Sequence, residues 1–295
     1  MTPPPFGRVL TAMITPFDQD GAVDHEAVWE LAKHLVETGS EGIVVAGTTG
    51  ESPTLSEDEK VALFRDVVEA VGDHAAVLGG TGTYDTAESV HLTKRACEVG
   101  CSGVMAVTPY YSRPPQQGLF EHFTAIADAS SVPVLLYNIP SRTGRLIEVE
   151  TLTRLAAHER IVAVKDAVGD LAFTTNTRRA CPDDFAIYSG DDILTLPMMA
   201  VGAVGIVSVA AHLAGEQVAA MVAAAVSGDW EEARRLHLAL APLFGALFAE
   251  PNPIPVKAAL DAMWRPVGRP RLPLIAASSE TVDRVKEALA AARNA

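Results

Sequence analysis

Lys165 stands near the end of the run Ile161 to Ala167, which is apolar enough to form a buried strand. Burial disfavours the charged form of lysine, and a neutral amine is a nucleophile toward carbonyl carbon. Lys165 is therefore a candidate for forming a Schiff base with a carbonyl substrate. The alternative is a lysine that reaches out from the strand end and pairs with Asp166 or Asp170.

Polar residues also follow the other apolar runs. In the turn from Gly47 to Ser52, glycines allow the backbone to approach a ligand, and the adjacent hydroxyls and amides can bind a carboxylate. Similar positions are occupied by the segments Thr108–Tyr111, Tyr137–Gly144 and Ser189–Asp192. Taken singly, these are turns, half-buried tyrosines and a surface arginine. Together they supply a nucleophile, hydroxyls for proton transfer and Arg142 for a carboxylate.

These segments lie together only if the chain folds as a barrel, with all of them at the same end. Eight short apolar runs recur along it, and their continuous hydrophobicity indicates strands covered on both faces, which is typical of a parallel sheet flanked by helices. The runs are 8–17, 42–47, 75–82, 103–111, 132–140, 161–167, 185–192 and 202–209.

Amphipathic segments with helical periodicity lie between the runs, at 24–37, 56–71, 86–99 and 117–129, and Ser56 and Glu59 have the spacing of a capping box. Eight strand-helix units predict an α/β fold, a (β/α)8 TIM barrel over residues 1–224, with catalytic residues at the carboxyl ends of the strands. Alanine-rich segments at 216–226, 230–248, 255–264 and 279–292 predict a C-terminal helical domain, residues 225–295, that serves packing and subunit contact.

Composition restricts the partners. Lys and Arg number 23 against 37 Asp and Glu, and a net charge of −14 argues against binding of nucleic acid or an anionic membrane. Three cysteines without zinc-ribbon spacing indicate a reducing compartment. The start at Met1 to Phe6 has no charged n-region or apolar h-region, and no apolar run reaches membrane-spanning length. We expect a cytoplasmic protein.

Three motifs carry a resemblance. Gly47-Thr-Thr-Gly-Glu51, Tyr137-Asn-Ile-Pro-Ser-Arg-Thr-Gly144 and Val164-Lys165 with Gly169 stand in an order and at separations that resemble the dihydrodipicolinate synthase branch of the pyruvate-dependent class I aldolases. The resemblance extends from Thr11–Pro16 to Asn252–Lys257. It implies condensation of pyruvate with L-aspartate 4-semialdehyde in lysine and diaminopimelate biosynthesis, without metal or organic cofactor, in a homotetramer built as a dimer of dimers.

The resemblance also implies roles for single residues. Lys165 forms the imine with pyruvate, and Tyr137, Thr48 and Tyr111 relay protons, with Tyr111 inserted into the site of the neighbouring subunit. The pyruvate carboxylate binds the hydroxyls and amides of Thr48 and Thr49, and the fork of Arg142 holds the carboxylate of the semialdehyde. Gly190 and the Val207 carbonyl line the same site.

Two alternatives remain at this point. Related aldolases that act on sialic acid or other sugar acids use the same lysine and tyrosine, and Arg142 argues against them because a polyol acceptor has no use for it. A barrel that binds 2-oxo acids without turnover is disfavoured by the intact set of Lys165, Tyr137 and Thr48.

The chain departs from feedback-inhibited members of the family in the cleft where they bind L-lysine. Histidines of the helix after the Gly-Thr-Thr-Gly-Glu turn are replaced by Glu57 and Lys60, and an Asn is replaced by Tyr84, while Glu88 is kept. Lys60 either repels the ammonium groups of lysine or pairs with Glu88 and fills the cleft. Both predict weak or absent inhibition by lysine.

Overall fold

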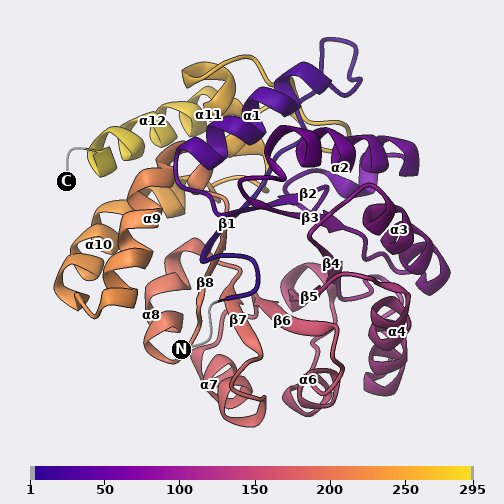
Figure 1. Cartoon of the computed structure of the whole chain (residues 1–295). Helices are drawn as coiled ribbons and strands as arrows, with labels where there is room; N and C mark the ends of the chain where they lie inside the picture. Colours follow the sequence, from indigo (N-terminus) through magenta and orange to yellow (C-terminus); the bar gives the residue numbers. More distant parts are fainter. Residues whose placement is uncertain (1–3, 294–295) are drawn as a thin grey trace.

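The computed structural model describes residues 4–293, and Figure 1 shows a ring of helices around a barrel of eight parallel strands. The barrel closes in chain order, with β8 pairing β1. Each strand lies inside one of the eight apolar runs, so the predicted α/β barrel is confirmed. The strands are β1 Val9–Ala12, β2 Gly42–Val45, β3 Ala76–Gly80, β4 Gly103–Val107, β5 Val134–Asn138, β6 Ile161–Asp166, β7 Ala186–Ser189 and β8 Gly205–Ser208.

The outer ring consists of helices that bury one apolar face against the strands. They are α1 His25–Glu37, α2 Glu57–Val71, α3 Thr86–Glu98, α4 Gln116–Ala129, the single turn α5 Pro140–Thr143, α6 Val149–Leu155, α7 Leu171–Ala180 and α8 Thr195–Ala200. The predicted capping box starts α2: Ser56 Oγ accepts from the Glu59 amide at 3.2 Å, and Glu59 Oε2 accepts from the Ser56 amide at 2.8 Å. Short 3-10 turns, η1 Ser52–Thr54 and η2 Asp192–Leu194, follow β2 and β7.

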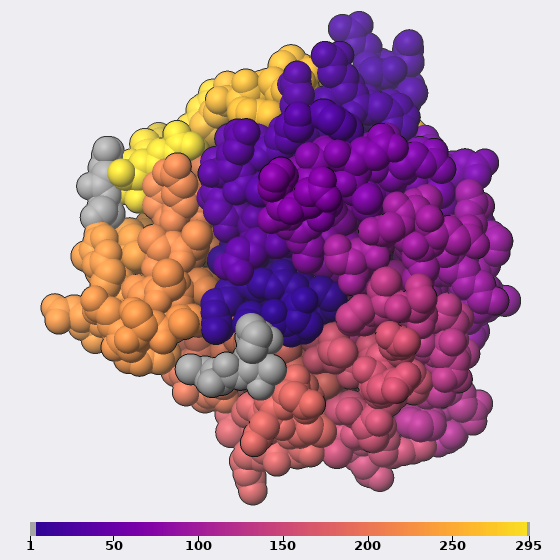
Figure 2. All heavy atoms as spheres, viewed as in Figure 1, coloured from indigo at the N-terminus to yellow at the C-terminus, as the bar shows by residue number. Residues whose placement is uncertain are grey.

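The interior of the barrel is packed with side chains, as is usual for this fold. Alternate residues of each strand point inward, so Ala163 and Lys165 on β6 lie on the inner face with Tyr137 of β5. Phe6 closes the end where the strands begin, since it contacts Gly103, the first residue of β4. Figure 2 shows this indigo segment across the centre of the ring. Lys165 belongs to the opposite end.

The C-terminal region forms α9 Ala211–Ser227, α10 Trp230–Ala246, α11 Ile254–Met263 and α12 Ser279–Arg293. Helices α9, α10 and α12 pack on one another, and α9 also packs against α1 and β1 (Figure 1). The predicted helical appendage is thus present. The domain boundary predicted between residues 224 and 225 falls inside α9, and the division into two domains stays a prediction.

Residues 1–3, which form part of the start examined for a targeting signal, lie outside the described residues. From residue 4 to residue 293, no helix has the length and apolarity needed to cross a membrane.

Candidate active site

Lys165 and Tyr137 lie side by side because their strands pair in register. The register matches Lys165 of β6 with Tyr137 of β5 on one side and with Tyr188 of β7 on the other. Lys165 Nζ lies 4.2 Å from the centre of the Tyr137 ring. The amine therefore contacts the face of a phenol inside the barrel.

The amine of Lys165 is poised for nucleophilic chemistry. Only 5% of the residue is exposed, and this burial lowers the pKa of Lys165 to about 8. Asp192 opposes the shift, and the positive charge of Arg142 adds to it. A substantial fraction of the amine is consequently neutral and nucleophilic in mildly alkaline solution.

Both carboxylates proposed as ion-pair partners of Lys165 have other roles. Asp166 accepts hydrogen bonds from the Thr174 hydroxyl at 2.7 Å and the Val168 amide at 3.0 Å. Asp170 caps α7 by accepting from the Ala172 amide at 2.8 Å. Neither carboxylate therefore explains why a lysine is buried at this position.

Asp192 is the buried carboxylate that acts on Lys165, and no sequence pattern assigns it this role. It accepts hydrogen bonds from the Ser208 hydroxyl at 2.5 Å and from the amides of Val209 and Ala210 at 3.0 and 3.3 Å. Burial raises the pKa of Asp192, while these donors lower it. A single acidic residue at a strand end is too common a pattern for the sequence alone to single out.

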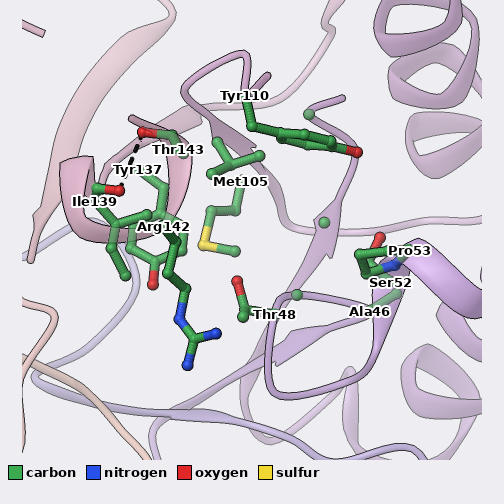
Figure 3. Close-up of a pocket in the computed structure, with 14 residues that line it drawn as sticks. Ala46, Thr48, Ser52, Pro53, Met105, Tyr110, Tyr137, Ile139, Arg142 and Thr143 are labelled. Atoms are coloured by element: carbon green, nitrogen blue, oxygen red, sulfur yellow. Dashed lines mark hydrogen bonds between the residues drawn. The ribbon is translucent and has the colours of Figure 1, made fainter. Parts of the chain in front are cut away.

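A cavity of about 240 Å³ opens at the carboxyl ends of the strands. Figure 3 shows Thr48, Tyr137 and Arg142 pointing toward one another, with Tyr110 further along the cavity. The cavity is lined by Ala46, Gly47, Thr48, Ser52, Pro53, Gly80, Gly82, Met105, Val107, Tyr110, Tyr137, Ile139, Arg142 and Thr143. Three of the eight predicted site residues thus line one cavity.

The Tyr137 phenol and the Thr48 hydroxyl point toward one another in the cavity (Figure 3). Burial raises the pKa of Tyr137 to about 12, and the Arg142 charge and the Thr48 hydroxyl oppose this. In the chain without substrate, desolvation outweighs the nearby positive charge, so the Tyr137 phenol stays protonated. A cation closer to the phenol is needed to reverse the shift.

The short turn that carries Arg142 is tied to the end of β5. Asn138 donates through Nδ2 to the Ile147 carbonyl and accepts from the Ile147 amide, each at 3.0 Å. The Thr143 hydroxyl donates to the Ile139 carbonyl at 3.0 Å, as drawn in Figure 3. These bonds fix the backbone from which Arg142 extends into the cavity.

Thr49 is buried in the turn after β2. Its hydroxyl oxygen accepts a hydrogen bond from Asn252 Nδ2 at 2.9 Å. Two residues further on, Glu51 forms a buried ion pair with Lys257 at 2.8 Å. The C-terminal region, expected to serve packing, therefore also contacts the site. Asn252 falls in the segment Asn252–Lys257 to which the resemblance extends, but it lies between α10 and α11, where no periodic signal predicts its contact with Thr49.

Gly190 lies beside Lys165, and Val207 lies on the inner surface of the barrel. A Cβ at position 190 would come within 2.7 Å of the Ala167 Cβ and 3.1 Å of the Lys165 Cγ, so only glycine fits beside the lysine. Val207 of β8 belongs to the packed barrel interior.

Tyr111 does not enter the cavity of its own chain. It is 93% exposed and has a φ of 68°, in the left-handed region that is strained for a tyrosine. The neighbouring Tyr110 lines the cavity instead. The loop thus points its two tyrosines differently, one inward and one outward.

Across residues 4–293, His, Cys, Asp and Glu side chains form no group of three that could hold a metal ion.

Comparison with known proteins gives a consistent result over nearly the whole chain. Residues 5–292 match the model of the dihydrodipicolinate synthetase family. The chain is 55% identical over 284 residues to the 4-hydroxy-tetrahydrodipicolinate synthase of Moorella thermoacetica, covering 96% of this chain and 97% of the relative. It is 52% identical to the enzyme of the same name from Synechococcus elongatus, covering 98% and 95%.

Solved structures agree. The dihydrodipicolinate synthase of Cyanidioschyzon merolae with lysine bound superposes with a TM-score of 0.96 at 46% identity, covering 98% of this chain and 99% of the other. The Bacillus anthracis enzyme superposes with a TM-score of 0.94 at 47% identity, covering 97% and 98%.

Proposed function

We propose that this chain, which belongs to the dihydrodipicolinate synthetase family, carries out the reaction of that family through Lys165. The chain is a lyase of the 4-hydroxy-tetrahydrodipicolinate synthase type, which condenses pyruvate with L-aspartate 4-semialdehyde in lysine and diaminopimelate biosynthesis. The observation that carries the residue assignment is the buried amine of Lys165, with a pKa of about 8, against the Tyr137 ring.

The reaction starts at the neutral amine. Lys165 Nζ attacks the ketone carbon of pyruvate, and loss of water gives a protonated imine. The positive nitrogen accepts the electron pair left when the methyl group loses a proton, which produces an enamine. The enamine carbon then attacks the aldehyde carbon of the semialdehyde. Each step requires a proton to be moved close to Lys165.

Tyr137 and Thr48 are suited to move these protons. Their hydroxyls point toward one another in the cavity (Figure 3), and the Lys165 nitrogen lies against the Tyr137 ring. An imine cation at that position stabilises the phenolate and lowers the pKa of Tyr137 from its raised value. Thr48 and Thr49 bind the pyruvate carboxylate through hydroxyls and amides, while Gly190 and Val207 line the pocket around the imine.

Arg142 binds the carboxylate of the semialdehyde. Its guanidinium extends into the cavity beside Tyr137, and a planar fork of donors matches a carboxylate in two parallel hydrogen bonds (Figure 3). A sugar-acid aldolase would place hydroxyl groups here and would leave this charge unpaired. Arg142 therefore favours the semialdehyde as acceptor.

Tyr111 completes the site of a neighbouring subunit. Its exposed side chain and left-handed backbone support this role, because a strained loop residue at the mouth of the barrel is retained where it serves function. We place the chain in a homotetramer, a dimer of dimers, in the cytoplasm.

Turnover with different acceptors tests the proposal. The purified protein is incubated with pyruvate and either L-aspartate 4-semialdehyde or sugar-derived aldehydes, and condensation is followed in a coupled assay. We expect high turnover when the semialdehyde is the acceptor and low turnover with the sugar-derived aldehydes. The Lys165→Ala variant should turn over neither acceptor. Preference for a sugar-derived aldehyde would assign the site to a sugar-acid aldolase, and pyruvate binding without turnover would indicate a simple 2-oxo-acid-binding barrel.

A further inference from the structure

Asn252 links the C-terminal region to the turn after β2. It lies just before α11, 203 residues from Thr49 along the chain. Its Nδ2 donates to Thr49 Oγ1 over 2.9 Å, and the two residues are only 7% and 3% exposed. Bulk water is thereby kept from this contact, and the hydrogen bond sets the orientation of the Thr49 hydroxyl.

A threonine hydroxyl has one proton and can both donate and accept. When its oxygen accepts from an amide N–H, its proton points elsewhere and is available to an acceptor. We propose that Asn252 is a positioning residue that fixes the Thr49 hydroxyl as a hydrogen-bond donor toward the carboxylate of the 2-oxo acid. This inference rests on the proposed function, in which Thr49 binds pyruvate.

The other atom of the Asn252 carboxamide supports a functional role. Asn252 Oδ1 is buried and has no hydrogen-bond partner among residues 4–293. A buried acceptor without a partner is unfavourable, and such groups are uncommon in folded proteins. The Asn252 carboxamide thus directs its N–H donor to Thr49 and leaves its own oxygen unpaired. This arrangement is understandable if the direction of the Thr49 hydroxyl matters.

The backbone of the same turn is fixed independently by other contacts. Glu51 has a φ of 57° and accepts from Lys257 Nζ and the Arg271 amide, each at 2.8 Å. The Thr15 hydroxyl donates to the Gly50 carbonyl at 2.7 Å. Because these bonds hold the turn without Asn252, a change of Asn252 alters mainly the Thr49 hydroxyl.

Two variants of Asn252 separate donor from acceptor. Asn252→Ala removes the donor, and Asn252→Asp replaces it with an acceptor of the same shape. In the second variant the Thr49 proton would turn to the introduced carboxylate, whose negative charge would also repel the pyruvate carboxylate. The probe is pyruvate itself: Lys165 is trapped by borohydride over a range of pyruvate concentrations, and the half-saturating concentration is read from labelled protein.

We expect the half-saturating pyruvate concentration to rise roughly fivefold in Asn252→Ala and roughly tenfold to a hundredfold in Asn252→Asp. The KM for the semialdehyde should stay near the wild-type value in Asn252→Ala. Asn176→Asp, on the exposed side of α7, carries the same change of charge and should behave as wild type. Equal or tighter pyruvate binding by Asn252→Asp would overturn the inference, because it would mean that Thr49 donates to Asn252 in the native protein.

A double-mutant cycle excludes a merely structural effect. In a Thr49→Val background no hydroxyl remains to be oriented, so adding Asn252→Ala should change half-saturation by less than about twofold. The same rise in both backgrounds would contradict the proposal. The cycle and the Asp variant are independent, so one variant that fails to fold leaves the other test. An untrapped wild type would refute the proposed function itself, whereas a trapped wild type with unaffected Asn252 variants would refute only this inference.

Discussion

Lys165 and Tyr137 are register partners on neighbouring strands, and the lysine nitrogen lies 4.2 Å from the centre of the tyrosine ring. Strand pairing in a closed barrel therefore sets the distance between the nucleophile and the phenol, without help from flexible loops. Burial acts on the two groups in a complementary way, since it lowers the pKa of Lys165 to about 8 and raises that of Tyr137 to about 12. Burial thus shifts both side chains toward their neutral forms before pyruvate binds.

The lowered pKa of Lys165 predicts how imine formation depends on pH. The neutral fraction of the amine increases as pH rises through about 8, not through the usual lysine value. The rate of borohydride-trapped labelling at limiting pyruvate should therefore increase between pH 7 and 9 and then level off, with an apparent pKa of about 8. A rate that keeps increasing above pH 10 would show that the Lys165 amine is not desolvated.

The same shift has a consequence for stability. The folded chain holds the Lys165 proton less tightly than the unfolded chain, so the unfolded state binds more protons between the two pKa values. The contribution of Lys165 to the free energy of unfolding should then increase with pH from about 8 upward, relative to Lys165→Met. Denaturant unfolding of both proteins at pH 7 and 9.5 measures the difference.

Replacing Arg142 with alanine should weaken the acceptor half of the reaction. Loss of a charge-assisted pair should cost about 1.5–3 kcal/mol of transition-state stabilisation. The kcat/KM for the semialdehyde should therefore fall roughly tenfold or more. Pyruvate should still be trapped, with the apparent pKa of Lys165 moved upward because Arg142 contributes to lowering it. Arg160→Ala, at the other end of the barrel before β6, is the matched control. Loss of the pyruvate adduct with normal use of the semialdehyde would show that the roles are misassigned.

Much of this site could be predicted from the sequence because its residues follow strands. Continuous apolar runs located the eight strands, and a parallel barrel brings the polar residues after them to one end. Lys165, Tyr137, Arg142 and Thr48 were found this way. Residues two apart on a strand share a face, and Ala163 lies in the barrel interior. Lys165, two residues later on β6, therefore also points inward.

The remainder depends on contacts that no local pattern encodes. Asn252 and Lys257 reach Thr49 and Glu51 across more than two hundred residues, and only the packing of the C-terminal helices fixes that proximity. The pKa of Tyr137 likewise follows from no local pattern, because the balance between burial and the charge of Arg142 depends on distances within the folded site.

Tyr111 should act in trans. Tyr111→Ala and Lys165→Ala are expected to be nearly inactive alone. When they are mixed under conditions of subunit exchange, each mixed dimer contains one complete site, with Lys165 from one chain and Tyr111 from the other, so activity should return in about half of the dimers. The test compares the condensation activity of the mixed variants with that of each variant kept unmixed. No recovery, with exchange verified by mass, would place Tyr111 in the site of its own chain or outside the chemistry.

L-Lysine should inhibit weakly or not at all. Lys60 is 6% exposed on α2, and burial lowers its pKa while Glu88 and Glu57 raise it. Glu57 is engaged by His91 at 2.8 Å and Arg95 at 3.2 Å on α3. An amino acid with two ammonium groups would meet the Lys60 charge, a repulsion on the order of a few kcal/mol at short range.

A titration of lysine at limiting pyruvate tests this prediction, with Lys60→Ala as the comparison and Lys94→Ala on α3 as the control. Removal of the Lys60 charge should increase sensitivity to lysine. Strong inhibition of the wild-type protein at sub-millimolar lysine would show that the cleft accepts the ligand despite Lys60.

Reductive trapping followed by peptide mass analysis shows directly whether Lys165 forms the imine with pyruvate. Protein is incubated with pyruvate and borohydride, digested, and compared with a sample reduced without pyruvate. We predict one pyruvate-derived group per chain, located on the peptide that contains Lys165, and none in Lys165→Arg. A label on another lysine, or no label on protein that catalyses the condensation, would contradict this account of the site.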